Sequence, residues 1–159
     1  MLMINMLEFS VFVGKVFDLI FIIIFGIILS TYFFIKGSKK EGYFSAGILI
    51  SAGILIKILK EIFMKARPLN MLIEESGYAF PSGHATISIV LFGGLAYLIS
   101  RNKSNKIKVI SLALSIILSL IVGFTRIYLQ VHDTYDILGG FLLGTIILYL
   151  GILLLSSKS

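Results

Sequence analysis

Long apolar stretches alternate with short polar ones along this chain of 159 residues, and the apolar stretches predict its helices. Five of them, with their flanks, approach the roughly 20 residues that a helix needs to cross about 30 Å of hydrocarbon. They cover residues 19–35, 43–59, 81–99, 109–124 and 137–155. The pattern therefore predicts one domain, 1–159, in which residues 19–155 form an all-α, polytopic membrane bundle of five transmembrane helices.

The first 18 residues follow a different pattern, because Asn5, Glu8, Lys15 and Asp18 interrupt an otherwise apolar sequence. Such a mixture is typical of an amphipathic helix that lies in the plane of the membrane interface. The segment has no basic n-region and no small-residue cleavage site, so a removable signal peptide is the weaker interpretation. We therefore expect an interfacial helix over residues 1–18.

The composition supports a membrane protein. Hydrophobic residues make up 58% of the chain and charged residues 14%, and the mean hydropathy is +1.04, outside the usual range of a soluble domain. Without cysteine and with two histidines, the chain has no disulfide, thiolate metal site or histidine-rich metal cluster. We expect no metal and no cofactor. No feature of the sequence indicates an oligomeric state.

The distribution of basic residues predicts the orientation of the chain. The net charge of +6 could indicate nucleic acid binding, but the basic residues lie in short tracts beside apolar stretches, without an aromatic-basic platform. Five crossings place the turns 36–42 and 101–108 and the C-terminus on one face. That face has one acidic residue and eight of the 14 basic ones, namely Lys36, Lys39, Lys40, Arg101, Lys103, Lys106, Lys108 and Lys158.

The opposite face has six basic and seven acidic residues, and it holds the loops 60–80 and 125–136. Since cytoplasmic loops are enriched in Lys and Arg, the face with eight basic residues is expected in the cytoplasm. The two polar loops would then lie on the extracytoplasmic side of the cell (inner) membrane.

The second of these loops carries candidate chemistry. If the chain is helical from His132 onward, Asp136 lies four residues later on the same face and can hold one ring nitrogen of His132. The other nitrogen could then act as a nucleophile or a base, and Arg126 could supply a fixed cation for an anionic substrate. The alternative is an interfacial loop with a solvated ion pair.

Two further clusters lie on the same predicted face. Lys60 and Arg67 are seven residues apart, so a helix that continues past residue 59 would point both cations in one direction until Pro68 ends it. The alternative is a pair of snorkelling cations, which is the interpretation we give to Lys57 and Lys65. Asp133, beside His132, could support the site indirectly, but a solvated loop acid is the favoured interpretation.

The other cluster is Pro81-Ser82-Gly83-His84, at the predicted start of a helix. Pro81 suits a first helical turn, Ser82 can cap the helix or contact an anion, and Gly83 lets the backbone approach closely, so the segment resembles a phosphate cradle. His84 is placed to give a proton to a leaving oxygen. An ordinary capped helix start is the alternative.

Taken together and in order, the three clusters resemble the tripartite signature of the type 2 phosphatidic acid phosphatase superfamily. The resemblance covers residues 60–136 and the helices around them, and it matches at every charged and catalytic position. One departure is Thr125, where the family usually has serine before the arginine. Because a hydroxyl is kept, we expect its phosphate contact to survive.

The resemblance implies metal-independent hydrolysis of a lipid phosphate or diphosphate through a phosphohistidine intermediate. It assigns His132 as the nucleophile, Asp136 as the residue that orients it, and His84 as the acid that protonates the leaving oxygen and then activates water. The phosphate oxygens would be bound by Lys60, Arg67, Ser82, Gly83 and Arg126. Cations and a helix N-terminus suit a phosphoryl transition state whose charge is spread over its oxygens.

The substrate stays open among undecaprenyl diphosphate, phosphatidylglycerol phosphate, phosphatidate and a lipid A phosphate. The small size and the outward site favour undecaprenyl diphosphate. A non-enzymatic transporter or scaffold would explain the apolar stretches but not three cation and histidine clusters on one face. The remaining alternative is a soluble vanadium-dependent haloperoxidase, a member of the wider family with a similar anion-binding pocket. Five spanning stretches favour a lipid substrate instead.

Overall fold

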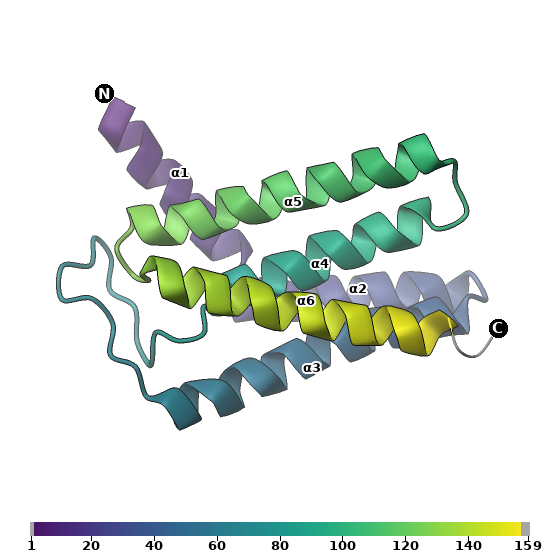
Figure 1. Ribbon diagram of the computed structural model, residues 1–159, viewed down its shortest axis with the longest axis horizontal. Helices are drawn as coiled ribbons and strands as arrows, with labels where there is room; N and C mark the ends of the chain where they lie inside the picture. Colours follow the sequence, from purple (N-terminus) through teal and green to yellow (C-terminus); the bar gives the residue numbers. More distant parts are fainter. Residues whose placement is uncertain (1, 157–159) are drawn as a thin grey trace.

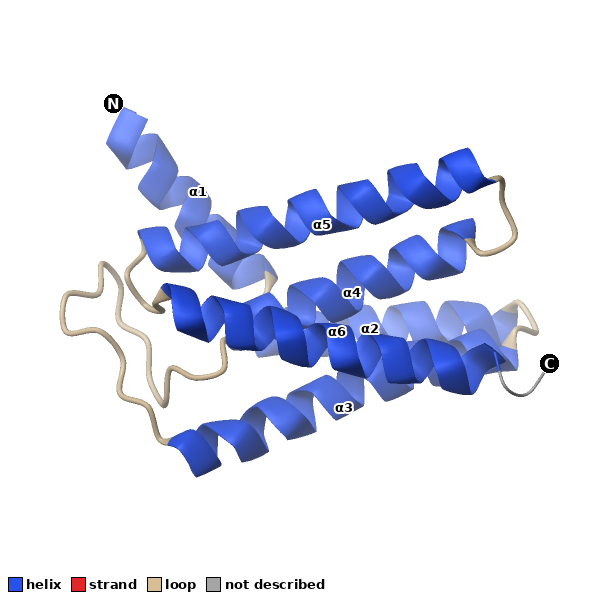
Figure 2. Cartoon of the chain, in the orientation of Figure 1, coloured by secondary structure: helices blue, strands red, loops and turns tan. Residues whose placement is uncertain are grey.

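The structure, a computed structural model, describes residues 2–156 and is helical throughout apart from its turns and loops (Figures 1 and 2). Lys158, one of the eight basic residues counted above, lies outside this range. Six helices are found in the described range: α1 (Leu2–Val16), α2 (Leu19–Ile35), α3 (Lys39–Phe63), α4 (Gly83–Ser100), α5 (Asn105–Tyr128) and α6 (Thr134–Ser156).

The all-α membrane fold predicted from the sequence is confirmed, but three helices, α3, α5 and α6, are longer than predicted. Helix α5 continues to Tyr128, so Arg126 lies on the helix and not in a loop. Helix α3 ends at Phe63, where Met64 adopts a left-handed conformation with φ 43°. The prediction that one helix carries both Lys60 and Arg67 as far as Pro68 is therefore wrong, because the chain leaves the helix four residues before Arg67.

Four helices, α3 to α6, are each long and apolar enough to cross a membrane. Helix α2 has 17 residues, which at 1.5 Å per residue extend about 25 Å and so fall short of the hydrocarbon core. It passes the same test only together with α1, from which it is bent by 52°, so the described residues contain four candidate spans, or up to five if the bent pair is one span. The interfacial position of α1 stays a prediction.

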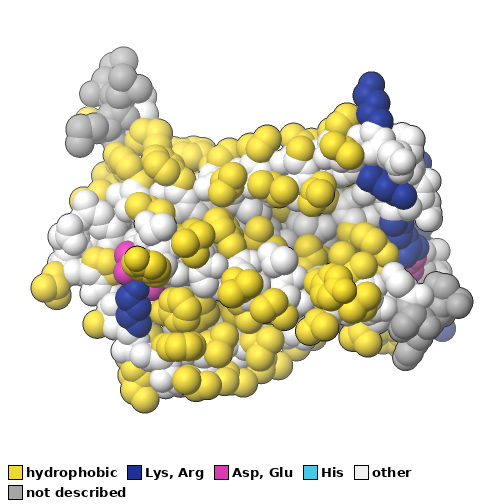
Figure 3. Space-filling view, in the orientation of Figure 1, with side chains coloured by type: hydrophobic (Ala, Val, Ile, Leu, Met, Phe, Trp, Pro, Cys, Tyr) yellow, Lys and Arg dark blue, Asp and Glu magenta, His cyan; other side chains and the backbone are white. Residues whose placement is uncertain are grey.

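The two ends of the bundle differ in the way the sequence predicts. The turns before α3 and before α5 lie at the same end as the last turn of α6, and the long loop 64–82 lies at the other end beside residues 129–133 (Figure 1). On the face shown in Figure 3, hydrophobic side chains cover the sides of the helices, and most of the Lys and Arg side chains gather at the end opposite the long loop. This surface is suited to lipid.

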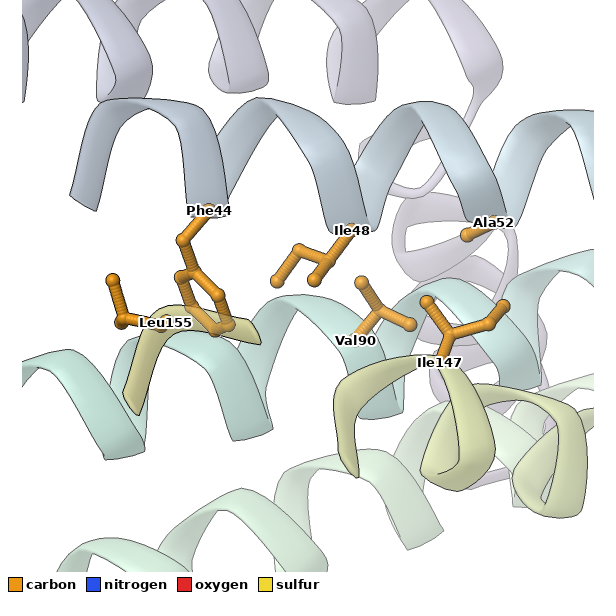
Figure 4. Close-up of a cluster of buried hydrophobic side chains, with 6 residues drawn as sticks. All are labelled: Phe44, Ile48, Ala52, Val90, Ile147 and Leu155. Atoms are coloured by element: carbon orange, nitrogen blue, oxygen red, sulfur yellow. The ribbon is translucent and has the colours of Figure 1, made fainter. Parts of the chain in front are cut away.

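Helix α4 is the centre of the bundle and packs against α3, α5 and α6. Its core with α3 and α6 contains six buried side chains (Figure 4): Phe44, Ile48, Ala52, Val90, Ile147 and Leu155. Glycines bring α6 close to α4, because a Cβ at Gly140 would lie 2.6 Å from Ser82 O and one at Gly144 would lie 2.7 Å from Thr86 O. This close packing places the start of α4 against the start of α6.

Candidate active site

The start of α4 is capped by Ser82, which is fully buried. Its hydroxyl accepts a hydrogen bond from Ala85 N at 3.4 Å, and its backbone N–H donates to Asp136 O at 3.0 Å. Pro81 precedes the cap, so it is not in the first helical turn as predicted. The first N–H groups of a helix, here those of Gly83 and His84, have no partner within the helix and favour an anion.

Lys60 and Arg67 reach the same end of the bundle by separate routes. Lys60 Nζ, on the last turn of α3, donates to Tyr78 O at 2.7 Å. Arg67, within the loop, donates to the backbone oxygens of Ser76 and Gly77, both at 3.1 Å, and of Val131 at 2.9 Å.

These hydrogen bonds hold the cation and the loop together. Arg67 also lies 3.6 Å from the Glu75 carboxylate. Burial lowers the pKa of Arg67, and Glu75 and Asp136 oppose that shift, but an arginine stays charged under all ordinary conditions. A guanidinium has five N–H donors, so the bonds to backbone oxygens orient Arg67 and still leave donors for an oxyanion.

Arg126 is the most deeply placed of the three cations, with 1% of its surface exposed. Its Nη2 donates to Ser10 O of α1 at 2.5 Å, and its Nε donates to the Thr125 hydroxyl at 3.3 Å. That hydroxyl in turn donates to Val122 O at 2.7 Å. The Thr125 hydroxyl thus contacts the guanidinium of Arg126 and helps to orient it; its phosphate contact stays a prediction.

His132 lies just before α6 and is buried, with 3% of its surface exposed. Its Nδ1 is 3.5 Å from Asp136 Oδ2, which is too long for a strong hydrogen bond, and no other described residue bonds this nitrogen. Its Nε2 lies 3.4 Å from Arg67 Nη1. Burial lowers the pKa of His132; Asp136 opposes this shift and Arg67 adds to it. The ring is therefore neutral at pH 7, with a lone pair available.

His84, on the first turn of α4, faces α1. Its Nε2 donates to Gly14 O at 3.2 Å. A Cβ at Gly14 would lie 2.7 Å from Arg126 Nη1 and 2.9 Å from Nη2, so only a glycine lets α1 approach this closely. The C-terminal half of α1 thus covers both His84 and Arg126 with backbone oxygens, those of Gly14 and Ser10, which no side-chain motif in the sequence indicates.

The three clusters form one site. Arg126, His132 and Arg67 lie close enough to His84 for their charges to act on it, and Arg67, Glu75 and Asp136 act in the same way on Lys60. All eight residues selected from the sequence therefore lie at the end of the bundle that carries the long loop. In the described part of the chain, no three His, Cys, Asp or Glu side chains are grouped as a metal site would require.

Sequence reasoning missed two residues of this site. Lys65 is not a snorkelling cation, because its Nζ lies 2.5 Å from Asp133 Oδ2 and 2.7 Å from Asp136 Oδ1. Asp133 is partly solvated, with its side chain 44% exposed, but it also has a structural role, since its Oδ1 accepts from Asp136 N at 3.0 Å and so caps α6. The Asp-x-x-Asp spacing at 133–136 is a capping signal that could have identified Asp133; Lys65 has no comparable signal.

Comparison with known proteins now adds to this geometry. The family model described as "PAP2 superfamily" matches residues 42–158, which include α3 from Gly42 onward, all of α4 to α6 and every residue selected above. The chain belongs to the PAP2 superfamily. This is the type 2 phosphatidic acid phosphatase family whose motifs the sequence resembles.

Two curated relatives support the membership in the PAP2 superfamily. Phosphatidylglycerophosphatase B of Bacillus subtilis is 34% identical over 100 residues, which cover 61% of this chain and 49% of the relative. Undecaprenyl-diphosphatase of Sulfolobus acidocaldarius is 31% identical over 124 residues, which cover 74% of this chain and 56% of the relative. The chain thus spans about half the length of the curated relatives it matches.

The PAP2 fold is also found in a crystal structure, that of the transmembrane PAP2-type phosphatidylglycerolphosphate phosphatase from Bacillus subtilis. The two structures superpose with a TM-score of 0.84 at 26% sequence identity, and the match covers 93% of this chain and 75% of the other. Since nearly all of this chain takes part in the match, the arrangement of its helices is that of a transmembrane PAP2 protein.

Proposed function

We propose that this protein hydrolyses a lipid phosphate or diphosphate, without a metal ion, through a phosphohistidine at His132. The observation that carries the proposal is the convergence of two histidines, three fixed cations and the N-terminus of α4 on one site. The names of the relatives, which are both lipid phosphate phosphatases, support the same reaction.

In this proposal the neutral His132 attacks the phosphorus atom through Nε2, the nitrogen near Arg67. Arg67, Arg126 and Lys60, with the N–H groups of Gly83 and the start of α4, bind the phosphate oxygens and stabilise the charge of the transition state. Asp136 faces Nδ1 and stabilises the positive charge that the ring acquires when Nε2 bonds to phosphorus. The P–O bond to the leaving group breaks as the new N–P bond forms.

His84 then completes the reaction. For this step His84 must be in its imidazolium form, with both ring nitrogens protonated, as favoured by the negative charge of a bound phosphate. Its Nε2–H, which donates to Gly14 O in the structure, would instead donate a proton to the leaving oxygen and leave the ring neutral. The neutral His84 then takes a proton from a water molecule, whose oxygen attacks the phosphohistidine and releases inorganic phosphate and free His132. For this cycle the phosphate must occupy the space beside the last turn of α1.

For the substrate we propose undecaprenyl diphosphate first. The relative named undecaprenyl-diphosphatase covers the larger share of this chain, 74%, and an extracytoplasmic site has access to a lipid diphosphate on the outer leaflet. Phosphatidylglycerol phosphate is the second candidate, because the other relative and the matched crystal structure are both phosphatases named for it.

A substrate panel in detergent tests the reaction. Undecaprenyl diphosphate, phosphatidylglycerol phosphate, phosphatidate and a lipid A phosphate are each supplied to the full chain, with and without a chelator, and to His132→Ala as the control. We expect phosphate release from one lipid or more, unaffected by the chelator and absent in the variant. Loss of release with the chelator would exclude the metal-independent reaction, and no release from any of the four would exclude the function.

Cysteine labelling tests the face on which the site lies. The chain has no cysteine of its own, so Ser76→Cys in the long loop and Ser104→Cys at the opposite end are single reporters in exposed positions. We expect a membrane-impermeant thiol reagent to label position 76 in sealed cells and position 104 only after the membrane is opened. The reverse pattern would place the site in the cytoplasm.

A further inference from the structure

Lys65 lies between two carboxylates at the site, in a position that the proposed reaction leaves unassigned. Its Nζ is 2.5 Å from Asp133 Oδ2 and 2.7 Å from Asp136 Oδ1. The Lys65 side chain is 36% exposed, whereas the Asp136 side chain is fully buried. A buried carboxylate is strongly destabilising unless it is paired. Lys65 therefore supplies the cation that Asp136 needs in order to stay charged in the interior.

The two carboxylates also hold each other through the backbone. Asp133 Oδ1 accepts a hydrogen bond from Asp136 N at 3.0 Å, and Asp136 Oδ2 accepts one from Asp133 N at the same distance. This reciprocal arrangement is a capping box at the start of α6. It leaves Asp136 Oδ2 facing His132 Nδ1 at 3.5 Å and Asp136 Oδ1 facing Lys65.

The backbone of Lys65 is fixed as well. Its carbonyl oxygen accepts a hydrogen bond from Ala79 N at 2.8 Å, which ties the start of the long loop to its end. The ammonium group is thus attached to a loop that is closed on itself and bonded, through Arg67, to Val131 beside His132. The Lys65 contacts connect the end of α3 to the start of α6 at the residues that the reaction uses.

From these contacts we infer that Lys65, together with Asp133, is a positioning residue that holds the Asp136 carboxylate in the place from which it orients His132. The inference deepens the proposed function, since it rests on His132 being the nucleophile. Without Lys65, the carboxylates of Asp133 and Asp136 repel each other, and Asp136 is held toward the ring only by the hydrogen bond from Asp133 N to its Oδ2. His132 is then oriented less firmly.

A direct contact between Lys65 and the substrate phosphate is the competing role. The structure favours positioning, because both contacts of the ammonium group are to carboxylates, and a phosphate would have to compete with two negative groups. Burial opposes the charged form of Lys65, but the hydrogen bonds to Asp133 and Asp136 outweigh it and raise the pKa of Lys65. A positioning residue changes kcat, whereas a phosphate ligand changes KM and the affinity for vanadate.

Kinetics of matched variants separate the two roles. Lys65→Gln removes the charge, and Lys65→Arg keeps it. Lys57→Gln is the control, because Lys57 is an exposed lysine of α3 that belongs to no part of the site. We expect kcat to fall about tenfold or more in Lys65→Gln, the usual loss for a charge-assisted contact. KM and vanadate affinity should stay within about twofold in this variant, and Lys65→Arg should recover most of kcat.

A chemical rescue repeats the test at the same position. In this cysteine-free chain, Lys65→Cys can be alkylated with bromoethylamine, which rebuilds an ammonium group at nearly the length of lysine. The purified, folded variant should have a low kcat that rises after alkylation. A kcat that alkylation does not raise would overturn the inference. So would a rise in KM with kcat unchanged, in either Lys65→Gln or Lys65→Cys.

The ring nitrogens of His132 report the positioning without any turnover. The chain has two histidines, so ¹⁵N-histidine labelling gives two sets of ring signals, which His84→Gln assigns. Lys65→Gln should shift the His132 signals and leave those of His84 in place. If the wild-type protein releases phosphate from no lipid, the proposed function fails, but these signals still test whether Lys65 affects the position of His132. Unshifted His132 signals in an active enzyme would overturn the positioning role alone.

Discussion

The two ends of the bundle are both rich in cations but hold them differently. At the end with the long loop, Lys60, Arg67 and Arg126 are fixed by hydrogen bonds to backbone oxygens of Tyr78, of the loops and of α1. At the opposite end, Lys103 in the turn before α5 and Lys106 and Lys108 in the first turn of α5 are exposed. Arg101 forms an ion pair with Glu41 that joins the end of α4 to α3.

This difference indicates separate uses for the same kind of charge. A cation held in one geometry by backbone oxygens is prepared for a developing negative charge and needs little rearrangement when that charge appears. An exposed lysine beside an apolar helix contributes to orientation in the membrane and little to stability. Changes at the site end should therefore affect the reaction, and changes at the other end should not.

The largest effect at the site end, short of removing the nucleophile, is expected for His84→Ala. This variant loses the group that protonates the leaving oxygen and activates water, so kcat should fall about 10²- to 10⁴-fold. Stopped-flow or steady-state phosphate release measures the loss. A kcat within a factor of a few of the wild type would remove His84 from the proposed reaction.

Arg126→Ala should have the next largest effect. A buried charge-assisted contact is typically worth about 1.5 to 3 kcal/mol, or roughly ten- to a hundredfold in binding, so both vanadate affinity and turnover should fall. Asp136→Asn is the matched comparison, since it should reduce turnover and leave vanadate affinity nearly unchanged. If Asp136→Asn lost vanadate binding as severely as Arg126→Ala, Asp136 would have to be assigned to the anion pocket.

A smaller effect is expected for Gly14→Ala, which tests the approach of α1. The new Cβ would lie 2.7 Å from Arg126 Nη1, and the flexible guanidinium is what gives way, so vanadate affinity should fall severalfold while the fold is kept. Gly47→Ala in α3 is the control, because a Cβ there meets no atom within 4 Å and the change in helix propensity is the same. Equal affinities in the two variants would contradict the role of α1.

The smallest effect is expected at the opposite end. Lys103 is exposed in the turn before α5, so Lys103→Gln should leave kcat/KM within about twofold of the wild type, as for most isolated surface charges. The measurement is phosphate release from the substrate found in the panel. A loss comparable to that of Arg126→Ala would mean that the two ends do not differ in the way described.

Much of this site could be predicted because its chemistry is local in sequence. The cluster at 81–84 and the pair at 132 and 136 have spacings that a helix start turns directly into geometry. Helix ends were harder. Nothing before Pro68 indicates that α3 stops at Phe63. We expected one helix to point Lys60 and Arg67 toward the same site, but it is the loop after α3 that brings Arg67 there.

The rest depends on contacts between residues far apart in sequence. Lys65 meets Asp133 and Asp136 across 68 and 71 positions, and a lysine at the end of an apolar stretch is usually a snorkelling cation. The contacts of α1 are made by backbone oxygens of Ser10 and Gly14, which every residue has, so no residue type distinguishes them. Tertiary packing alone brings these groups to the site.

The central claim is the covalent phosphohistidine at His132. Wild-type protein, His84→Ala and His132→Ala are each incubated with a lipid substrate carrying a labelled phosphate, quenched in base, and assayed for acid-labile label on the protein. We expect label on the wild type, slower formation but longer persistence on His84→Ala, and none on His132→Ala. Acid-labile label on His132→Ala would contradict the assignment of the nucleophile.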